Sequence, residues 1–384
     1  MDYLEQPFGF KVKKVLRYLS LYGINRTFYK VRGQLHLRRK YDSLPPRTRT
    51  GRKNQFIGLI GCGNYAFTTV AYFLTRQYGR VIGGCMDIDL NRAASLAEHF
   101  KIPSFTINAE EIIGNDSIKL VYIASNHATH AEYAIRALNR GKHVYIEKPP
   151  VVSEDQLSRL IQAMRESPGK VFLGFNRPGS RFGRIIRQYL NDEQGPGIYN
   201  WFVAGHDIDP DHWYFQPAEG GRILGNLCHW TDFILRLAGP HAFPVEIAPT
   251  RAATSDTNVA MAYHFAEGTI AVITFSAQGH IFEGVKERFS AHKGNCLLTM
   301  DDFKTLQIEL IDKKLRWRNF HRDHGHRQNI IAAAENVINE QSYDREEQLT
   351  HIQRTGLLFL KTKTALEQNK RLVVEEYAPT KVFV

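Results

Sequence analysis

The stretch FIGLIGCGNYAFTTVAYFL, from Phe56 to Leu74, decides the fold. A short apolar run ends in the pattern G-x-G-x-x-A, and a helical pattern follows it. In such a unit the first glycine permits a tight turn, the second lets a pyrophosphate approach the backbone, and the small third residue lets the helix pack on the strand. Free N–H groups at the helix start face the anion. We therefore predict a dinucleotide-binding turn formed by Gly61, Cys62, Gly63, Asn64, Tyr65 and Ala66.

An acidic residue at the end of the next predicted strand, RVIGGCM, strengthens this prediction. Asp87 lies 21 residues beyond Ala66, where a carboxylate accepts hydrogen bonds from an adenosine ribose. Its charge would repel a 2′-phosphate, which favours NAD, while the nearby Arg92 keeps NADP as an alternative. A glycine turn without a ligand is the other interpretation, and Asp87 argues against it.

Short apolar runs alternate with helical patterns from residue 56 onward. This alternation predicts an α/β protein with a Rossmann doubly wound parallel sheet over residues 56–175. Later runs such as VAMAYHF, TIAVITFSA and NCLLTM are separated by Glu-Gly or Lys-Gly turns. They predict a second, α+β domain with a large, mostly antiparallel sheet over residues 176–384, for substrate binding and oligomerisation. Two helices, at about 323–340 and 345–368, are expected to close the chain.

Residues 1–55 form a basic arm and linker of different character. They contain 14 Lys/Arg against 3 Asp/Glu, a difference of +11 that equals the net charge of the whole chain. The neutral remainder argues against nucleic acid as a partner. Val12, Val15, Leu16 and Leu19 have helical spacing, so the arm can lie on an anionic membrane surface, or pack on its own body or a second subunit. Packing is favoured by its additional apolar residues, Tyr18, Tyr22, Phe28, Tyr29 and Leu35.

The remaining composition is that of an ordinary globular protein. At 384 residues with 43% hydrophobic content, two domains are expected. We expect no membrane-spanning helix and no signal peptide, because long apolar runs and an h-region with a cleavage site are lacking. Four separated cysteines without a C-x-x-C indicate reduced thiols and a cytoplasmic protein, with membrane association left open through the arm. The scattered histidines lack ligand spacing, so no metal is expected.

The run VYIEKPP, Val144 to Pro150, ends a predicted strand with an acid and a base fixed by proline. Pro149 bars Lys148 from the helical region and gives the bond between them a real chance of being cis. Taken alone, such a run is more often only a charged turn. In a doubly wound sheet, however, ligands meet the carboxyl ends of strands. A desolvated lysine near a cationic ring would also have a lowered pKa, which suits it to relay a proton.

Together these motifs resemble the Gfo/Idh/MocA family of glucose-fructose oxidoreductase and inositol dehydrogenase relatives, from Phe56 to about Gln368. The resemblance is carried by the glycine turn, DIDLNRA, ASNHATHAEYAIRAL, GKHVYIEKPP and GGRILGNLCHWTD. Finer details, GCGNYA, NHATHA, DHWY, CHWTD and DHGHRQN, look like the branch that also occurs fused behind a zinc-type alcohol dehydrogenase half. In that comparison the basic arm is the counterpart of the connecting segment.

The resemblance implies catalytic roles for two residues. Lys148 would contact the substrate hydroxyl beside the nicotinamide, and His229 would be a general acid/base. Relatives have an aspartate four residues before this histidine, where this chain has Gly225. His229 then needs another orienting group, or it is a hydrogen-bonded packing residue.

The resemblance also implies binding residues in both domains. Further cofactor-binding residues would be Ser125, Asn126, His127, His130, Glu147 and Lys148, although His130 can equally be structural. The substrate-binding residues would be Lys148, Asn176, Arg177, Trp213, Tyr214, Asn226 and His229, although Trp and Tyr are at least as often core or interface residues.

The leading hypothesis is an NAD-dependent dehydrogenase acting on a ring hydroxyl or ketone of a sugar, nucleotide sugar or cyclitol, for example in polysaccharide biosynthesis. One alternative is an NAD-dependent lyase or hydrolase that oxidises its sugar transiently, which the missing aspartate favours. Another is a non-catalytic NAD- and sugar-sensing protein, which Lys148 and His229 argue against. A homo-oligomer, a dimer or tetramer, is expected because relatives pair through the open face of the antiparallel sheet.

Overall fold

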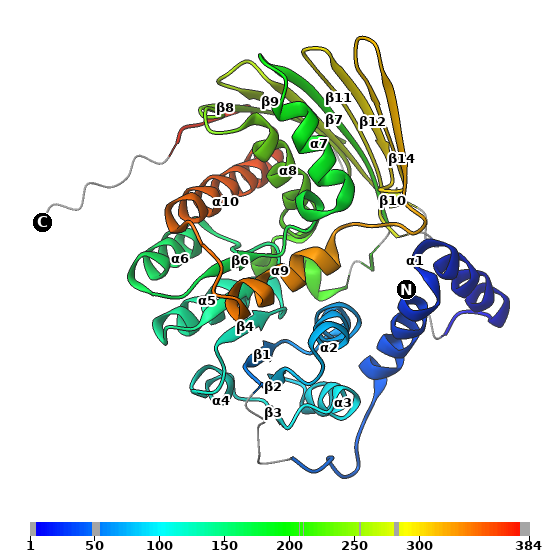
Figure 1. The fold of residues 1–384 in the computed structure, drawn as a ribbon, viewed down its shortest axis with the longest axis vertical. Helices are drawn as coiled ribbons and strands as arrows, with labels where there is room; N and C mark the ends of the chain where they lie inside the picture. The colour runs from blue at the N-terminus through cyan, green and yellow to red at the C-terminus, as the bar shows by residue number, and fades with distance from the viewer. Residues whose placement is uncertain are drawn as a thin grey trace, which may run out of the picture. The chain divides into compact units, whose positions relative to one another are not determined.

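The computed structural model describes residues 5–47, 54–206, 208–209, 211–252, 255–279 and 284–376 (Figure 1). The chain divides into two compact units, each with its own sheet. The first unit comprises Met1–Ser180, Gln216–Gly220 and Gly325–Leu349. The second comprises Arg181–Phe215, Gly221–His324 and Thr350–Val384. Two short later segments therefore belong with the N-terminal part of the chain.

Six short parallel strands form the sheet of the first unit, in the order β3-β2-β1-β4-β5-β6. This is the strand order of a dinucleotide-binding doubly wound fold, so the predicted Rossmann sheet is confirmed. Strands β1 and β4 are buried along their whole length because helices cover both faces. The strands are β1 (Ile57–Ile60), β2 (Ile82–Met86), β3 (Ser104–Thr106), β4 (Leu120–Ile123), β5 (His143–Ile146) and β6 (Val171–Leu173).

Helices flank this sheet, with α2 and α3 on one face and α5 and α6 on the other (Figure 1). The helix expected after the glycine turn begins as a π-helical segment, η1 (Ala66–Ala71), and continues as α2 (Tyr72–Tyr78). The Asp89 carboxylate caps α3 by accepting the N–H of Asn91. The other helices of this unit are α1 (Phe8–Arg38), α3 (Leu90–Phe100), α4 (Glu110–Ile113), α5 (His127–Asn139), α6 (Glu154–Glu166), η2 (Arg177–Gly179), η4 (Pro217–Glu219) and α9 (His326–Ile338).

The N-terminal arm forms α1 and packs on its own unit. Gly23, with φ 78° and ψ 170°, breaks the helix into two halves. In the second half the Tyr29 ring lies 4.4 Å from the Tyr72 ring and 6.2 Å from the Phe100 ring, measured between centroids. The favoured interpretation of the arm as a packed element therefore holds for this half. The apolar residues Val12 and Leu16 of the first half nevertheless remain exposed.

The second unit is built on a nine-stranded sheet in the order β14-β13-β12-β11-β7-β10-β9-β8-β15. Strands β7 and β10 run parallel, and the other neighbours run antiparallel, so the predicted mostly antiparallel sheet is confirmed. The strands are β7 (Gly197–His206), β8 (Val245–Ala252), β9 (Ser255–Phe265), β10 (Ile270–Gly279), β11 (Lys286–Lys293), β12 (Cys296–Asp301), β13 (Thr305–Glu309), β14 (Lys314–Arg318) and β15 (Leu372–Val374).

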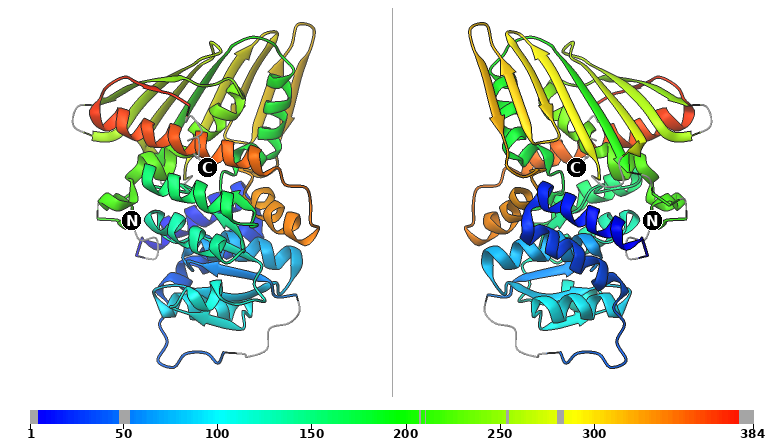
Figure 2. Two further views of the ribbon diagram at one scale, coloured as in Figure 1. Left: turned by 90° about the vertical axis from the view of Figure 1, so that its left-hand side faces the viewer. Right: turned by 90° about the vertical axis from the view of Figure 1, so that its right-hand side faces the viewer.

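Helices pack on one face of this sheet, while Figure 2 shows the strands of the other face open to view. Burial alternates along β7 and β12, as expected for a sheet with one covered face. The helices are α7 (Arg181–Asn191), η3 (Trp213–Phe215), η5 (Ile223–Leu227), α8 (Cys228–Ala238) and the main part of α10 (Arg345–Gln368). Among the residues that the structure describes, none of the helices has the length and apolar character needed to cross a membrane.

Candidate functional site

The glycine turn lies where β1, β2 and β4 end. Gly61 has φ 88°, and a Cβ atom there would lie 2.5 Å from the carbonyl carbon of Ala124. Its N–H donates to the Met86 carbonyl at 2.8 Å, which ties the turn to β2. A Cβ at Gly63 would meet nothing within 4 Å, so the backbone there has room for a close approach. Both glycines thus have the geometry that the sequence pattern predicts for a pyrophosphate turn.

Asp87 is fixed directly behind this turn. Its Oδ2 accepts the Cys62 N–H at 2.7 Å, and its Oδ1 accepts the Asp89 N–H at 2.9 Å. The side chain is almost fully buried. Because a carboxylate has about four acceptor positions, both oxygens keep capacity for further donors such as ribose hydroxyls. The structure therefore brings the predicted glycine turn and the predicted ribose acceptor together, and these residues fit the adenosine part of a dinucleotide.

The basic groups near Asp87 are paired with Asp89. The Asp89 Oδ2 lies 3.6 Å from both the Arg92 Nε and the Lys40 Nζ. Burial alone would raise the pKa of Asp89, but hydrogen bonds from Asn91 and these two cations lower it. The sequence analysis kept NADP as an alternative because of Arg92. In the structure this arginine forms an ion pair with the Asp89 carboxylate.

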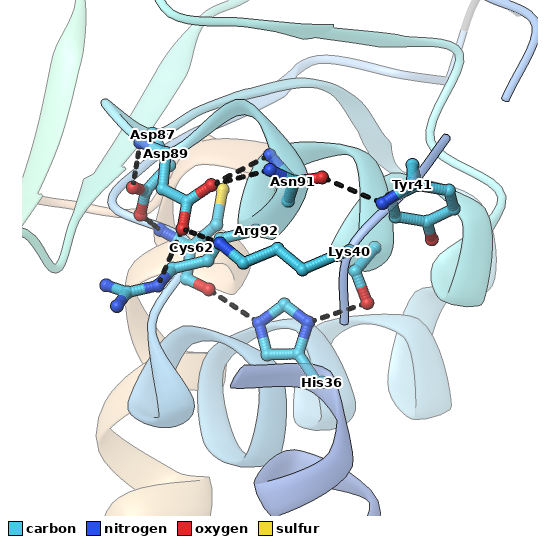
Figure 3. A network of polar contacts seen from close by, with 9 residues as sticks. His36, Lys40, Tyr41, Cys62, Asp87, Asp89, Asn91 and Arg92 are labelled. Atoms are coloured by element: carbon cyan, nitrogen blue, oxygen red, sulfur yellow. Dashed lines mark hydrogen bonds and ion pairs between the residues drawn. The ribbon is translucent and has the colours of Figure 1, made fainter. Parts of the chain in front are cut away.

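The N-terminal arm reaches the glycine turn through His36 (Figure 3). The His36 Nε2 lies 2.7 Å from the Cys62 carbonyl oxygen, and its Nδ1 lies 3.0 Å from the Ser95 Oγ. Because a carbonyl only accepts, Nε2 carries the proton, and Nδ1 accepts from the serine hydroxyl. Burial lowers the pKa of His36, which keeps the ring neutral and this arrangement intact. The ring also stacks on Phe67, with centroids 4.4 Å apart.

Two other residues of α1 contact the π-helical segment η1. At Gly33 a Cβ atom would fall 2.3 Å from the Thr68 Cγ2 and 2.4 Å from the Asn64 Oδ1, so only glycine permits this close approach. The Arg26 guanidinium donates to the Thr68 carbonyl oxygen. Segments of π-helix are often found at functional sites. Here the arm supports the helix that begins at the dinucleotide turn, a role that the sequence pattern did not reveal.

The loop after β4 is held by a residue from a distant segment, Glu219. Its Oε1 accepts the Asn126 side-chain amide at 2.5 Å, and its Oε2 accepts the Ala128 N–H at 3.1 Å. The His127 Nδ1 donates to the Glu219 carbonyl oxygen at 2.9 Å. The Ser125 hydroxyl bonds instead to Thr129, at 2.8 Å. Glu219 thus caps α5 and fixes Asn126 and His127, two residues predicted to bind the cofactor.

His130 connects this loop to the Lys148 turn. Its Nδ1 lies 2.8 Å from the Pro149 carbonyl oxygen, and its Nε2 lies 3.1 Å from the Ser125 carbonyl oxygen. Burial outweighs these two carbonyl contacts and lowers the pKa of His130 to about 4. A neutral ring has one N–H and donates to one of these two carbonyl oxygens, so His130 lies between the loop after β4 and the Lys148-Pro149 peptide, whose bond is cis. Lys148 itself is half-buried.

Glu147, beside Lys148, is a buried carboxyl whose protonation can be deduced from its neighbours. The Tyr145 oxygen lies 2.9 Å from the Glu147 Oε1 and 2.6 Å from the Asn329 Oδ1. The Asn329 amide nitrogen donates to the Leu173 carbonyl at 3.0 Å, which fixes the amide oxygen toward Tyr145. The tyrosine has one proton to give, so a protonated Glu147 completes the network as a donor. Burial raises the pKa of Glu147, in agreement with this assignment.

Three predicted residues of the first unit point into its interior. The Tyr65 hydroxyl lies 3.4 Å from the His326 Nδ1. The Asn176 amide nitrogen lies 3.4 Å from the His326 Nε2, and its Oδ1 accepts from Arg177 at 2.9 Å. Asn176 and Arg177 are both nearly fully buried. His326, from the DHGHRQN motif, therefore links residues that the sequence analysis assigned to separate sites.

The predicted substrate residues of the second unit surround the start of α8. His229 is buried on α8, and Asn226 lies just before it in the π-helical segment η5. The Tyr214 hydroxyl donates to the Asn226 Oδ1 at 3.1 Å, which brings two of these residues together. Trp213 remains 38% exposed and packs edge-on against Tyr214 at 5.5 Å between centroids. An aromatic face next to a fixed amide has the composition of a carbohydrate-binding surface.

Several contacting residues were missed by the sequence analysis, and each acts across a long sequence separation. Glu219 and His36 lie in no local motif, so a single sequence offers no signal for them, whereas Asn329 ends the DHGHRQN motif but was given no role. In the parts of the chain that the structure describes, no three His, Cys, Asp or Glu residues are grouped so as to hold a metal ion.

The parallel sheet, the glycine turn and Asp87 define a dinucleotide-binding Rossmann fold in an α/β protein. Residues 56–175 match the family model of Gfo/Idh/MocA proteins, described as "Oxidoreductase family, NAD-binding Rossmann fold". This match supports the family resemblance and a nicotinamide dinucleotide as cofactor.

Curated relatives align with part of the chain. An oxidoreductase from Formosa agariphila is 34% identical over 120 residues, which are 31% of this chain and 37% of that protein. An inositol 2-dehydrogenase from Ralstonia nicotianae is 28% identical over 137 residues, 35% of this chain and 41% of that protein. The aligned part thus spans less than half of each of these relatives.

A solved structure resembles most of the chain in fold. GenD2 from gentamicin A biosynthesis, in complex with NAD, has a TM-score of 0.67 and covers 87% of this chain and 100% of its own. Its sequence is 17% identical, so the likeness concerns the fold.

Proposed function

We propose that this protein is an oxidoreductase that transfers a hydride between a nicotinamide dinucleotide and a ring hydroxyl or ketone of a sugar, nucleotide sugar or cyclitol. The observation that carries the proposal is the Gly61 turn with Asp87 behind it, the carboxylate holding the Cys62 N–H at 2.7 Å. This arrangement lies at the carboxyl edge of a parallel sheet, where such folds bind dinucleotides. The aligned inositol 2-dehydrogenase supports a polyhydroxylated ring as substrate.

We infer that the cofactor is NAD rather than NADP. A 2′-phosphate would approach the Asp87 carboxylate, which is buried and held by two backbone donors, so repulsion would not be relieved by moving the side chain. Arg92, the nearby cation that could attract the phosphate, is 3.6 Å from Asp89. A charged pair of this kind offers less attraction to an anion than an isolated guanidinium.

For the chemistry we propose that Lys148 contacts the reacting oxygen of the substrate and that His229 is a general acid/base. When bound, the dinucleotide supplies the hydride acceptor or donor. Lys148 is half-buried, and its turn is supported by the His130 contact with Pro149 and by the buried Glu147. Trp213 and Asn226 are proposed to bind the ring of the substrate, with Tyr214 orienting Asn226. Asn176 and Arg177 are proposed as further substrate-binding residues.

A second candidate is a lyase or hydrolase that uses bound NAD for transient oxidation. It is favoured by Gly225, which stands where relatives of the leading class have an aspartate and is buried within the π-helical segment η5. A glycine at that position supplies no carboxylate to favour the protonated form of His229 during net oxidation.

One experiment separates these candidates. The purified protein is mixed with NAD and a panel of sugars, nucleotide sugars and cyclitols while the absorbance of NADH and the fate of the sugar are followed. Net NADH formation supports the dehydrogenase. Sugar cleavage or elimination without NADH supports the second candidate, and binding without turnover of any sugar supports a sensor and contradicts both.

We further propose a homo-oligomer, a dimer or tetramer, formed through the open face of the nine-stranded sheet. Ile198, Phe202 and Leu297 are 52%, 51% and 47% exposed there, and such apolar patches are common at subunit interfaces. Light scattering should give a multiple of the chain mass, and Phe202→Glu should reduce it.

Two further assignments are proposed on other grounds. A reducing, cytoplasmic location is supported by four buried free cysteines. Kinship with the branch fused behind zinc-type alcohol dehydrogenases is supported by the motifs quoted above. A membrane contact through the N-terminal arm is a separate proposal.

A further inference from the structure

The second half of α1 exposes its apolar side. Ile24, Phe28, Val31 and Leu35 follow one another at intervals of four, three and four residues, so they form one stripe along the helix. They are 78%, 52%, 41% and 56% exposed. In an ordinary surface helix such a stripe faces the core.

Contacts on the other side of the helix fix this orientation. Gly33 lies against Thr68 and Asn64, His36 bonds to the Cys62 carbonyl at 2.7 Å, and Arg26 donates to the Thr68 carbonyl. Turning the helix to bury the stripe would break these contacts and leave carbonyl groups without partners. The exposed apolar stripe is therefore a stable feature of the folded unit.

The first half of α1 repeats the pattern. Phe8, Val12 and Leu16 are 80%, 40% and 60% exposed, whereas Lys14 and Leu21, on the other side of the helix, are buried. Gly23 separates the halves, so two apolar stripes arise independently on one arm. An exposed apolar surface that recurs in this way marks an interaction site.

Charge distinguishes between the partners that could cover it. Residues 8–38 contain no Asp or Glu and eight basic residues. Two of these, Lys14 and Arg26, lie on the opposite side of the helix, which leaves Lys11, Lys13, Arg17, Lys30, Arg32 and Arg38. A second copy of the arm would bring the same positive charges and no acidic partner for them. An anionic lipid surface offers apolar depth for the stripes and negative head groups for the flanking cations.

We propose that α1 is an interfacial helix whose exposed stripes, Phe8/Val12/Leu16 and Ile24/Phe28/Val31/Leu35, insert into the head-group layer of an anionic phospholipid membrane. The opposite side of the same helix holds the dinucleotide turn. The arm thus joins the nucleotide-binding unit to a membrane surface without spanning the bilayer. This proposal does not depend on the reaction that the protein catalyses.

The test is sedimentation of the full-length protein with vesicles of phosphatidylcholine alone or mixed with phosphatidylglycerol. Wild-type protein should sediment with the anionic vesicles at low salt, less so as salt rises, and not with the neutral ones. The triple variant Ile24→Ser, Phe28→Ser, Leu35→Ser should lose binding on the order of tenfold or more. Ile311→Ser, at a residue that is 83% exposed and outside the arm, is the matched control and should bind like wild type.

The unfolding midpoint and NAD affinity of each variant are measured alongside, so that a loss of lipid binding in a folded, NAD-binding protein supports the proposal. Absence of sedimentation with anionic vesicles at low salt overturns it, as does unchanged binding by the triple variant. A fall in oligomeric mass on making the triple variant, without vesicle binding by wild type, would assign the stripes to a protein partner instead. Failure to bind NAD, by contrast, would count only against the oxidoreductase function.

Discussion

The contact between His36 and the glycine turn gives a prediction whose size follows from the structure. The substitution His36→Phe keeps a ring stacked on Phe67 but removes the hydrogen bonds to Cys62 and Ser95. The buried Cys62 carbonyl then loses its His36 donor, at about 1–3 kcal/mol, and the Ser95 hydroxyl loses an acceptor but keeps its contact with Tyr41, at about 0.5–1.5 kcal/mol. We therefore expect the free energy of unfolding to fall by about 1.5–4.5 kcal/mol.

Unfolding in urea at neutral pH measures this change, with Leu35→Ala as a control because Leu35 lies on the exposed side of the same helix. The control should stay within about 0.5 kcal/mol of wild type in the absence of lipid. Because Cys62 is the middle residue of the turn, the His36→Phe variant should also bind NAD about three- to tenfold more weakly.

The pH dependence of this effect has a definite sign. Burial lowers the pKa of His36, so the folded protein holds the ring neutral while the unfolded chain takes up a proton near pH 6.5. The difference in free energy of unfolding between wild type and His36→Phe should be largest above that pH. It should become smaller as the pH falls through it. A variant as stable as wild type at neutral pH, with unchanged NAD affinity, would refute the role assigned to His36.

Three further substitutions probe the site. Asp87→Asn removes the negative charge of the acceptor for the ribose hydroxyls, and hydrogen bonds to such a charged group contribute about 1.5–3 kcal/mol. NAD binding measured by calorimetry should therefore weaken about 10- to 150-fold, and the preference for NAD over NADP should fall. An unchanged affinity for NAD would show that Asp87 does not bind the ribose. Burial raises the pKa of Glu147, so its stabilising contribution is present below about pH 4.5 and is lost as the pH rises. Glu147→Gln should therefore gain stability relative to wild type as the pH rises above about 4.5 in urea unfolding, whereas a difference that is constant with pH would mean that the pKa of Glu147 is not raised by folding. Lys148→Met should lower kcat about 100-fold or more and leave NAD affinity nearly unchanged. A kcat equal to that of wild type would show that Lys148 takes no part in the reaction.

The parallel sheet was predictable because its signals are local. Each strand is a short apolar run, and the turn after β1 needs glycine where φ is 88° and where a Cβ would strike Ala124. Asp87 follows at a fixed distance because β2 is parallel to β1 and ends at the same edge. The sequence pattern thus specifies the fold and the position of the residues that we propose to bind the adenosine part of the cofactor.

The supporting residues were not predictable because their partners are remote in the chain. Glu219 caps α5 from 91 residues away, and Asn329 reaches Tyr145 across 184 residues. The orientation of α1 likewise depends on a close approach at Gly33 and on the bond from His36 to a carbonyl, neither of which alters the amphipathic pattern. Apolar spacing predicted a helix there but not which side would dock.

Isothermal titration of the purified protein with NAD tests the central claim most directly, with Asp87→Asn titrated in parallel. The arrangement of Gly61, Cys62 and Asp87 predicts saturable uptake of one NAD per chain, weaker binding of NADP, and a clear loss of affinity in the variant. Absence of heat and of saturation with either dinucleotide, in a protein that is folded by circular dichroism, would contradict it.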